Sequence, residues 1–385
     1  MQAKLKSTVA ALLVAGIGSI AFAGQASAQA VISGGASLPA LLYQAEKTHF
    51  NQSAFRAYVS KSSGVGKTAF LTNNPAGFDY STSVDKIVHW AGSDSALTAG
   101  ELSTYNSGLG ATNGRLVFIP SAGTSVNLPY RISGKTDLDL TTEQVCEIFT
   151  GAVTSWSQIP GSGSTGNIQV VYRNTSSGTT EIFTTFLNNA CDEYGITVPV
   201  TSTFQNIFPG NTAPSNFTGV AGSGDVRNGV AGAFNTIGYL SPDYTQAATV
   251  ASIDGLSPDA ANVTAALEGL ALPDGDATNP LSWIPAVTPI DGTYPIVGLT
   301  YILASQCYVN NGADVKAGLQ QHYAVTPNGQ ADGLVQSHFF ADLPDHWLEA
   351  IQLSFFDGDE NGLQFNNPDY CGVGAIAGRG NNPNL

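Results

Sequence analysis

Charged residues are scarce in this chain of 385 residues, and basic residues are the scarcest. Charged types make up 11% of the sequence, with 14 Lys and Arg against 29 Asp and Glu. Without Lys4 and Lys6, which lie in a leader described below, the 14 basic residues become 12 and the formal net charge becomes −17. Such a surface makes nucleic acid and anionic membranes poor partners, and we expect neither. An anion site in this protein must therefore act through local hydrogen bonds.

Motifs of metal-dependent and covalent hydrolysis are also lacking. The sequence has no G-x-S-x-G elbow, no H-E-x-x-H helix and no Cys-x-x-Cys pair, and its five histidines are scattered. Residues 357–362 (DGDENG) begin like a calcium loop, but Pro368 occupies the position of the required glutamate, so an acidic surface turn is the better interpretation. We expect no metal, no cofactor and no catalytic residue.

The chain begins with Lys4 and Lys6, an apolar run from Val9 to Ala23, and small residues around Ala28. This pattern predicts a secretory signal peptide over residues 1–29, because the run is too short for a membrane span and ends at a processing site. The leader contains no cysteine for lipid attachment. We expect a periplasmic or secreted protein that is not inserted in a membrane.

Four cysteines follow the leader, an even number for an oxidising compartment: Cys146, Cys191, Cys307 and Cys371. They predict two disulfides, for which the sequence allows three pairings. We favour Cys146–Cys191 and Cys307–Cys371, since each pair then closes a loop inside one half of the chain.

Strand and helix patterns alternate along the chain, which predicts the α/β class. Roughly 355 mature residues exceed one ordinary core, so we expect two domains. Helix starts are marked by Ser37 before Pro39 and by capping-box spacings at Thr98 and Thr141. The expected helices are 39–49, 98–105 and 141–150, and the expected strands are 86–91 and 116–120. Residues 115–128 and 294–305 could cross between domains, and residues 209–227 should form a long loop.

The segment from Val170 to Phe183 is the most informative part of the chain. It reads as a buried strand that ends at Arg173, followed by a Ser-Gly-Thr turn that opens a helix. The first N–H groups of a helix lack intrahelical partners and can bind an anion. Arg173 would add a planar fork, and the Ser177 and Thr179 hydroxyls would add donors. The alternative is a simple N-capped helix beside a salt-bridged arginine.

Two further segments have features of an anion site. Residues 62–68 (SSGVGKT) end like a nucleotide-binding loop but lack its first glycine, so either Ser63 belongs to a small anion-binding nest or the segment is a plain turn. Asp94 follows a predicted strand, where ligands bind in open α/β sheets, although it could be an Asx-turn residue. A carboxylate beside an oxyanion is repulsive unless the anion still carries a proton, as phosphate does and sulfate does not.

Taken together, these segments resemble the phosphate-binding proteins of bacterial ABC transporters, and most closely the exported DING proteins. The matching segments are residues 34–39, 66–71, 88–95, 140–156, 173–183, 237–239 and 294–300. All four cysteines also stand where DING proteins are expected to have them. The chain departs from the family at its mature N-terminus, where Val31-Ile32-Ser33-Gly34 replaces the Asp-Ile-Asn-Gly sequence that gives the DING proteins their name.

The resemblance implies a two-domain Venus flytrap fold with a two-segment hinge, in which the anion is enclosed between the domains. Residues 30–122 with 295–385 would form domain I, and residues 123–294 domain II, with hinges near 120–126 and 294–300. The implied phosphate ligands are Ser37, Leu38, Ser63, Asp94, Arg173, Ser177, Gly178 and Thr179. Asp94 would accept the proton of the phosphate.

We therefore expect a monomeric, high-affinity phosphate-binding protein that is not an enzyme. Its implied partners are inorganic phosphate and the membrane subunits of a phosphate transporter. Two alternatives remain: an exported phosphatase that uses the same oxyanion cradle, and an extracellular scavenging protein that serves no transporter.

Overall fold

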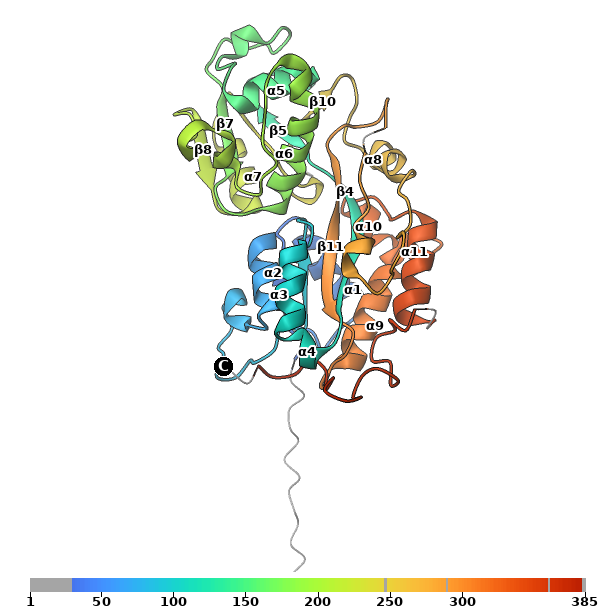
Figure 1. Cartoon of the computed structure of the whole chain (residues 1–385). Helices are drawn as coiled ribbons and strands as arrows, with labels where there is room; N and C mark the ends of the chain where they lie inside the picture. Colours follow the sequence, from blue (N-terminus) through green and yellow to red (C-terminus); the bar gives the residue numbers. More distant parts are fainter. Residues whose placement is uncertain (1–29, 246–247, 289, 359–360, 383–385) are drawn as a thin grey trace, which may run out of the picture.

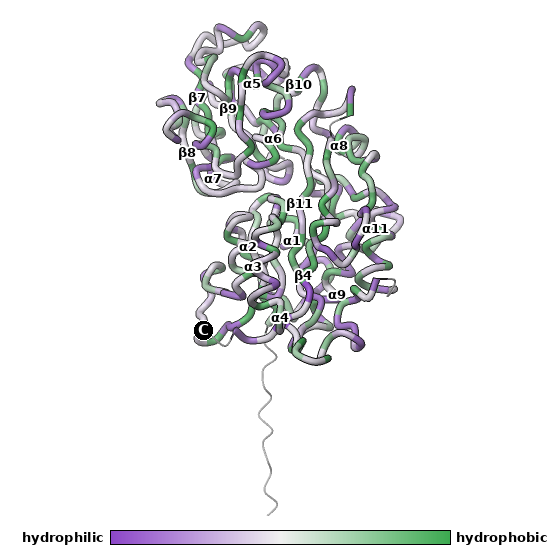
Figure 2. Tube along the Cα trace, viewed as in Figure 1, coloured by the Kyte–Doolittle hydropathy of each residue, from purple (hydrophilic) through white to green (hydrophobic). Residues whose placement is uncertain are grey.

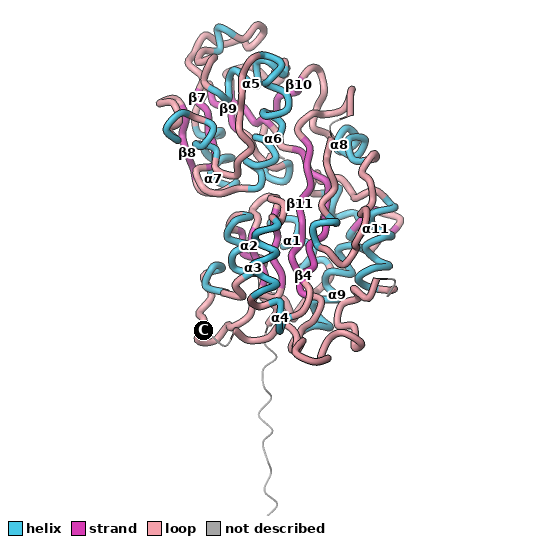
Figure 3. The backbone as a smooth tube through the Cα atoms, viewed as in Figure 1, coloured by secondary structure: helices cyan, strands magenta, loops and turns pink. Residues whose placement is uncertain are grey.

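The computed structural model describes residues 30–245, 248–288, 290–358 and 361–382, so the predicted signal peptide lies outside the described residues. The chain forms two lobes, one around a five-stranded sheet and the other around a six-stranded sheet (Figure 1). Helices cover both sheets, and loops make up much of the remaining chain (Figure 3). The predicted α/β class with two lobes is confirmed.

The first lobe has the strand order β2-β1-β3-β11-β4. Its strands are β1 (Ser33–Gly35), β2 (Val59–Ser60), β3 (Trp90–Ser93), β4 (Leu116–Ser125) and β11 (Val297–Ser305). Every residue of β3, β4 and β11 is buried, as expected for strands covered on both faces. Hydrophobic residues follow these central strands (Figure 2).

Helices α2 (Ser63–Leu71) and α3 (Ala99–Ser107) flank one side of this lobe, and α9 (Gly312–Tyr323) and α11 (Asp345–Ile351) flank the other (Figure 1). The lobe also contains α1 (Ala40–His49), α4 (Gly110–Asn113), α10 (Leu334–Ser337) and a small hairpin, β12 (Val325–Thr326) with β13 (Gly329–Gln330). The predicted capping box at Thr98 is confirmed, because its hydroxyl accepts from Glu101 N–H at 3.2 Å.

The second lobe has the strand order β6-β10-β5-β9-β7-β8. Its strands are β5 (Leu128–Arg131), β6 (Asp139–Leu140), β7 (Gln169–Arg173), β8 (Phe217–Val220), β9 (Thr236–Gly238) and β10 (Thr249–Ile253). Its helices are α5 (Thr142–Thr150), α6 (Gly178–Cys191) and α7 (Ser223–Gly232). Thr141 forms the second predicted capping box, with Gln144.

Strands β4 and β11 are antiparallel: β4 runs toward the second lobe, and β11 returns from it. They correspond to the two predicted crossing segments. Residues 126 and 127 connect β4 to the second sheet: Val126 N–H donates to Ile296 O at 2.9 Å, and Asn127 pairs with Leu240 of the second lobe. The pairing of β4 with β11 is interrupted at Ser121, because Pro120 faces Tyr301 while Ala122 faces Thr300. This irregularity is a β-bulge, which changes the direction of the bulged side chain.

The segment between β10 and β11 packs against the first lobe, although the sequence-based division assigned it to domain II. Helix α8 (Ala260–Leu267) contacts β4. Trp283 packs edge-on against Trp347 at 6.1 Å between ring centroids, and His346 lies 2.8 Å from the carbonyl of Leu270. This segment therefore belongs with the first lobe and not with domain II, whose end was predicted at residue 294. The reason is that Trp283 packs against Trp347 of α11.

Two sequence-based predictions of local structure are wrong. The strand predicted over 86–91 begins at Trp90, because the His89 ring nitrogen Nδ1 accepts the Ile32 N–H that a strand carbonyl would otherwise bind. The loop predicted over 209–227 contains β8 and the start of α7. In that segment, parallel pairing of β8 with β7 and burial of Phe217 override the Gly- and Asn-rich composition.

The favoured disulfide pairing is confirmed. Cys146 and Cys191 join α5 to the end of α6, and Cys307 joins Cys371 near the C-terminus, across sequence separations of 45 and 64 residues. Each disulfide stays within one lobe, so neither of them joins the two lobes.

Candidate anion-binding site

The candidate site lies where the N-termini of helices from both lobes meet. From the first lobe, Ser37 and Leu38 follow β1 and precede α1, Ser63 is the first residue of α2, and Asp94 follows β3. All four residues are buried, with at most 5% of their surface exposed. The ends of neighbouring parallel strands converge at one edge of the sheet, which brings these separate segments together.

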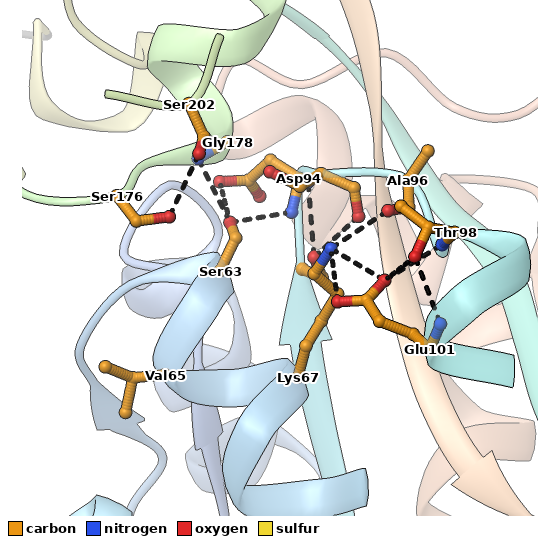
Figure 4. A network of polar contacts seen from close by, with 12 residues as sticks. Ser63, Val65, Lys67, Asp94, Ala96, Thr98, Glu101, Ser176, Gly178 and Ser202 are labelled. Atoms are coloured by element: carbon orange, nitrogen blue, oxygen red, sulfur yellow. Dashed lines mark hydrogen bonds and ion pairs between the residues drawn. The ribbon is translucent and has the colours of Figure 1, made fainter. Parts of the chain in front are cut away.

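Ser63 connects the two lobes (Figure 4). Its hydroxyl donates to Asp94 Oδ2 at 3.2 Å and accepts N–H groups from Asp94 at 3.0 Å and from Gly178 at 3.2 Å. Ser62, not Ser63, caps α2, because Ser62 Oγ accepts from Val65 N–H at 3.3 Å. The Ser63 hydroxyl is therefore available to other partners at the helix N-terminus.

Arg173, at the end of β7, is the buried cation of the site, with 1% of its surface exposed. Its Nη1 donates to Ser37 Oγ across the lobes at 3.0 Å, and its Nη2 donates to Thr175 Oγ1 at 3.2 Å. Among the described residues it forms no salt bridge, so the salt-bridged alternative does not apply.

The start of α6 supplies the other predicted residues of the second lobe. Ser177 caps the helix, with Oγ accepting from Thr180 N–H at 3.4 Å, and Gly178 and Thr179 form its first turn. The capping interpretation is thus correct for Ser177, but it does not exclude a ligand, because Gly178 N–H donates across the lobes to Ser63 Oγ and not within its own helix.

Gly178 is required by the close approach of the lobes. A Cβ atom at this position would lie 2.6 Å from Ser63 Oγ and 2.6 Å from the Asp94 carbonyl carbon. Real Cβ contacts do not become this short. Any larger residue would therefore hold the helix away from the opposite wall.

Several polar atoms converge on the site without protein partners. Asp94 Oδ1, Arg173 Nε and Thr179 Oγ1 are fully buried and lack a hydrogen bond within the described part of the chain. Buried polar atoms ordinarily have partners, because each unsatisfied group costs about 1–3 kcal/mol. These three groups without partners are a cation, a hydroxyl donor and a carboxylate acceptor. Together they suit an anion that also carries a proton.

The electrostatics of Asp94 fit this acceptor role. Burial raises the pKa of Asp94 from 3.8 to about 7, against the opposing effects of Thr300, Ser63 and Arg173. Burial also lowers the pKa of Arg173, although a guanidinium remains charged at any physiological pH. At neutral pH the carboxylate can therefore exchange a proton with a ligand.

The structure brings all eight predicted residues to this region, and the sequence analysis missed two others. Ser223, at the start of α7, lies 2.9 Å from Ser37 Oγ and 3.5 Å from Arg173 Nη1. Thr300 of β11 interacts with the Asp94 carboxyl. The Gly222-Ser223-Gly224-Asp225 run, which has N-cap spacing, was a usable signal for Ser223; Thr300 had none, because it lies inside an apolar strand.

The nucleotide-like segment 62–68 contributes Ser63 to the site but not its lysine. Lys67, from the loop-like segment, donates to Ala96 O at 3.0 Å and lies 3.1 Å from Glu101 Oε1, so it is held on the first lobe (Figure 4). Within the described ranges no group of three His, Cys, Asp or Glu side chains could hold a metal ion. Asp359 and Glu360 of the calcium-like turn lie outside the described residues.

Comparisons with known proteins agree on one family. A model of the PBP superfamily domain matches residues 21–323. A Pseudomonas aeruginosa protein named "Alkaline phosphatase L" is 40% identical over 368 residues, which cover 93% of this chain and 97% of the relative. A "Phosphate-binding protein" of an unknown prokaryotic organism is 38% identical over 373 residues, or 88% and 97%.

Solved structures give the same result. A high-affinity periplasmic phosphate-binding protein, PfluDING, bound with phosphate, has a TM-score of 0.83 at 36% identity and covers 91% of this chain and 99% of its own. A phosphate-binding protein from Stenotrophomonas maltophilia has a TM-score of 0.82 at 40% identity, covering 91% and 100%. In the part of the chain that the structure describes, no helix is long and apolar enough to cross a membrane.

Proposed function

Because this chain belongs to the PBP superfamily, and within it to the DING-type phosphate-binding proteins, we propose that it binds inorganic phosphate between its two lobes. Relatives of similar length and fold bind phosphate, and one was solved with phosphate bound. The function proposed is reversible binding of a small anion.

In this proposal Arg173 supplies the positive charge and two directed N–H groups. Ser37, Ser63, Ser177 and Thr179 provide hydroxyl donors, and the amides of Leu38, Gly178 and Thr179 complete the shell. The four oxygen atoms of phosphate point in different directions and each accepts several hydrogen bonds, so a shell with donors from both lobes is needed to replace its hydration.

The observation that carries the proposal is Asp94, whose Oδ1 atom is buried near Arg173 and has no hydrogen-bond partner among the described residues. A carboxylate in contact with an anion is favourable only if the anion donates a proton to it. Sulfate at neutral pH cannot do so and would leave Asp94 unpaired against like charge. Sites that lose such a hydrogen bond reject the analogue by about 10⁴-fold or more.

Calorimetric titration of the purified mature protein with phosphate and with sulfate tests this proposal. We expect tight phosphate binding and much weaker sulfate binding above pH 8, where Asp94, whose pKa burial raises to about 7, is ionised and cannot donate to sulfate. Comparable affinities for the two anions would overturn the role of Asp94. Identification of the anion that co-purifies with the protein provides an independent check.

We also propose that the two lobes close on phosphate by a hinge motion. The hinge segments would be residues 126–127 and the connection between β10 and α8, residues 254–259. Residues 30–125 with 260–385 would move as one body, and residues 128–253 as the other. The packing of α8 and Trp283 against the first lobe supports this revised division. Small-angle scattering that shows no compaction on adding phosphate would contradict closure.

We further propose that the protein is periplasmic or secreted and delivers phosphate to the membrane subunits of a transporter. The signal-like leader, the PBP fold and a relative described as periplasmic support this location and role. Deletion of the gene should reduce phosphate uptake at low external phosphate. Unchanged uptake, together with recovery of the protein from the medium, would instead favour scavenging.

Hydrolysis of phosphate esters is the second candidate, because several relatives carry the name "Alkaline phosphatase L". Binding is favoured, because the Ser63 hydroxyl that donates to Asp94 also accepts two backbone N–H groups, and no described hydrogen bond joins a serine of the site to a histidine base. Turnover of a chromogenic phosphate ester that disappears in Asp94→Asn would support hydrolysis.

A further inference from the structure

A line of buried polar side chains leads away from the proposed phosphate site into the first lobe. Tyr43 Oη lies 2.8 Å from Ser121 Oγ, which lies 2.9 Å from His322 Nε2. On the far side of the ring, His322 Nδ1 lies 2.8 Å from Glu46 Oε1. At most 6% of the surface of any of these four residues is exposed, and none belongs to the site described above.

Thr300 stands between this line and Asp94. Its side chain is fully buried in β11, and the pairing of Tyr301 with Ser93 places Thr300 beside Asp94. The Thr300 hydroxyl opposes the rise in pKa that burial causes in both Tyr43 and Asp94. In this structure neither Thr300 Oγ1 nor Asp94 Oδ1 completes a well-aligned hydrogen bond with any described residue.

The β-bulge in β4 builds the middle of the line. Ser121 is the extra residue of the bulge, so neither its side chain nor its carbonyl follows the regular ladder opposite Thr300 and Tyr301. The freed carbonyl accepts from Gln330 Nε2 at 2.8 Å and lies 3.0 Å from His322 Nε2. The bulge disrupts the ladder hydrogen bonds locally, but it lets Ser121 contact both Tyr43 and His322.

The chemistry of the donors sets the direction of the line. A carbonyl oxygen can only accept, so the contact with Ser121 O requires that His322 Nε2 carries a hydrogen. Ser121 Oγ can then accept from His322 and donate its own hydrogen to Tyr43. The Tyr43 hydrogen is left for Thr300, and the Thr300 hydrogen for Asp94 Oδ1. Each donor thus points toward the carboxylate, which favours its ionised form.

We propose that Thr300, Tyr43, Ser121 and the His322–Glu46 pair form a directional hydrogen-bond relay that keeps Asp94 an acceptor and thereby sets the pH range and anion selectivity of binding. This inference rests on the proposed phosphate function. The five residues are positioning residues, since only Asp94 would contact the ligand.

Other charged and titratable groups face the two ends of the relay. Near Asp94 these are Arg173 of β7, Glu181 of α6, and the neighbouring Tyr58. Near His322 they are Glu46 of α1 and Asp342. Burial opposes protonation of His322, but the Glu46 carboxylate nonetheless raises the pKa of the ring above its ordinary value. The histidine end therefore remains a donor over the neutral range.

The test is calorimetric titration of phosphate and sulfate between pH 5.5 and 9 with wild type, Tyr43→Phe and Thr300→Val. Both substitutions remove one hydroxyl and keep the side-chain shape, and they interrupt the relay at different points. Tyr105→Phe is the matched control, because Tyr105 is also buried in the first lobe but bonds to Gly114 O. Comparison within one buffer series cancels the titration of phosphate itself.

We expect the lower pH limit of phosphate binding to move up by about half to one pH unit in both relay variants, the shift that loss of one hydrogen bond to the ionised form produces. Discrimination against sulfate should fall by about 3- to 10-fold for the same reason. Tyr105→Phe should match wild type. Profiles for both relay variants that coincide with the control would overturn the relay, while failure of wild type to bind phosphate would instead overturn the proposed function. Thermal unfolding shows whether each variant is folded.

Discussion

Replacement of Asp94 by Asn should stabilise the protein in the absence of phosphate while destroying phosphate binding. Burial raises the pKa of Asp94 from 3.8 to about 7, so the folded chain holds this proton more tightly than the unfolded chain. Between about pH 4 and pH 7 the folded state binds more protons, and its stability therefore falls as pH rises through this window. Asn has no charge to bury and should not show this loss.

The magnitude follows from the pKa. One pKa unit corresponds to about 1.4 kcal/mol, so a rise of roughly three units costs about 4 kcal/mol of unfolding free energy once Asp94 is ionised. The Asn amide would still bury a polar atom without a partner, which offsets about 1–2 kcal/mol of the gain. The expected net stabilisation above pH 7 is therefore about 2–3 kcal/mol.

Urea denaturation at pH 5 and pH 8, after removal of phosphate, measures this effect. Asp94→Asn should gain over wild type at pH 8 and gain much less at pH 5. Asp274→Asn, a substitution of an exposed carboxylate, serves as the control and should show no such difference between the two pH values. An advantage of Asp94→Asn that is equal at both pH values would refute burial of the charge as its cause.

Three further results are expected. Gly178→Ala should weaken phosphate binding by at least about 10-fold, because its Cβ would separate the lobes, whereas Gly100→Ala, with open space around it, should bind normally in calorimetry. Arg173→Lys should lose about 10- to 100-fold in affinity, since an ammonium cannot reproduce the guanidinium fork, and equal affinity would argue against directed contacts. Removal of the Cys307–Cys371 disulfide should lower the unfolding free energy by about 2–5 kcal/mol in denaturant titration without changing phosphate affinity, because the disulfide lies within one lobe.

Local sequence signals predicted much of the framework. The capping boxes at Thr98 and Thr141 marked the starts of α3 and α5, and loop closure within each half of the chain led to the disulfide pairing that the structure contains. These features depend on residues a few positions apart or on simple loop closure. Predictions failed where distant contacts decide, as in residues 209–227, which composition assigned to a loop and which contain β8 and the start of α7.

The candidate site shows the same division. Arg173 and the Ser-Gly-Thr turn were visible because a strand end and a helix start lie next to each other in sequence. Thr300 was missed because its role depends on Asp94, more than 40 positions away, and Ser223 was missed although the helix start at Gly222 and Asp225 was visible. The return of the chain from the second lobe was placed too late for a similar reason, as burial of Trp283 against Trp347 cannot be seen in either residue alone.

The sequence indicated the kind of chemistry: in an acidic α/β chain, an arginine beside a helix N-terminus predicted an anion site that acts through local donors. Only the tertiary structure decided the state of Asp94. Convergence of both lobes buries its carboxyl, raises its pKa to about 7 and leaves Oδ1 facing the site. Desolvation depends on everything packed around a group, so no pattern of neighbouring residues could have fixed it.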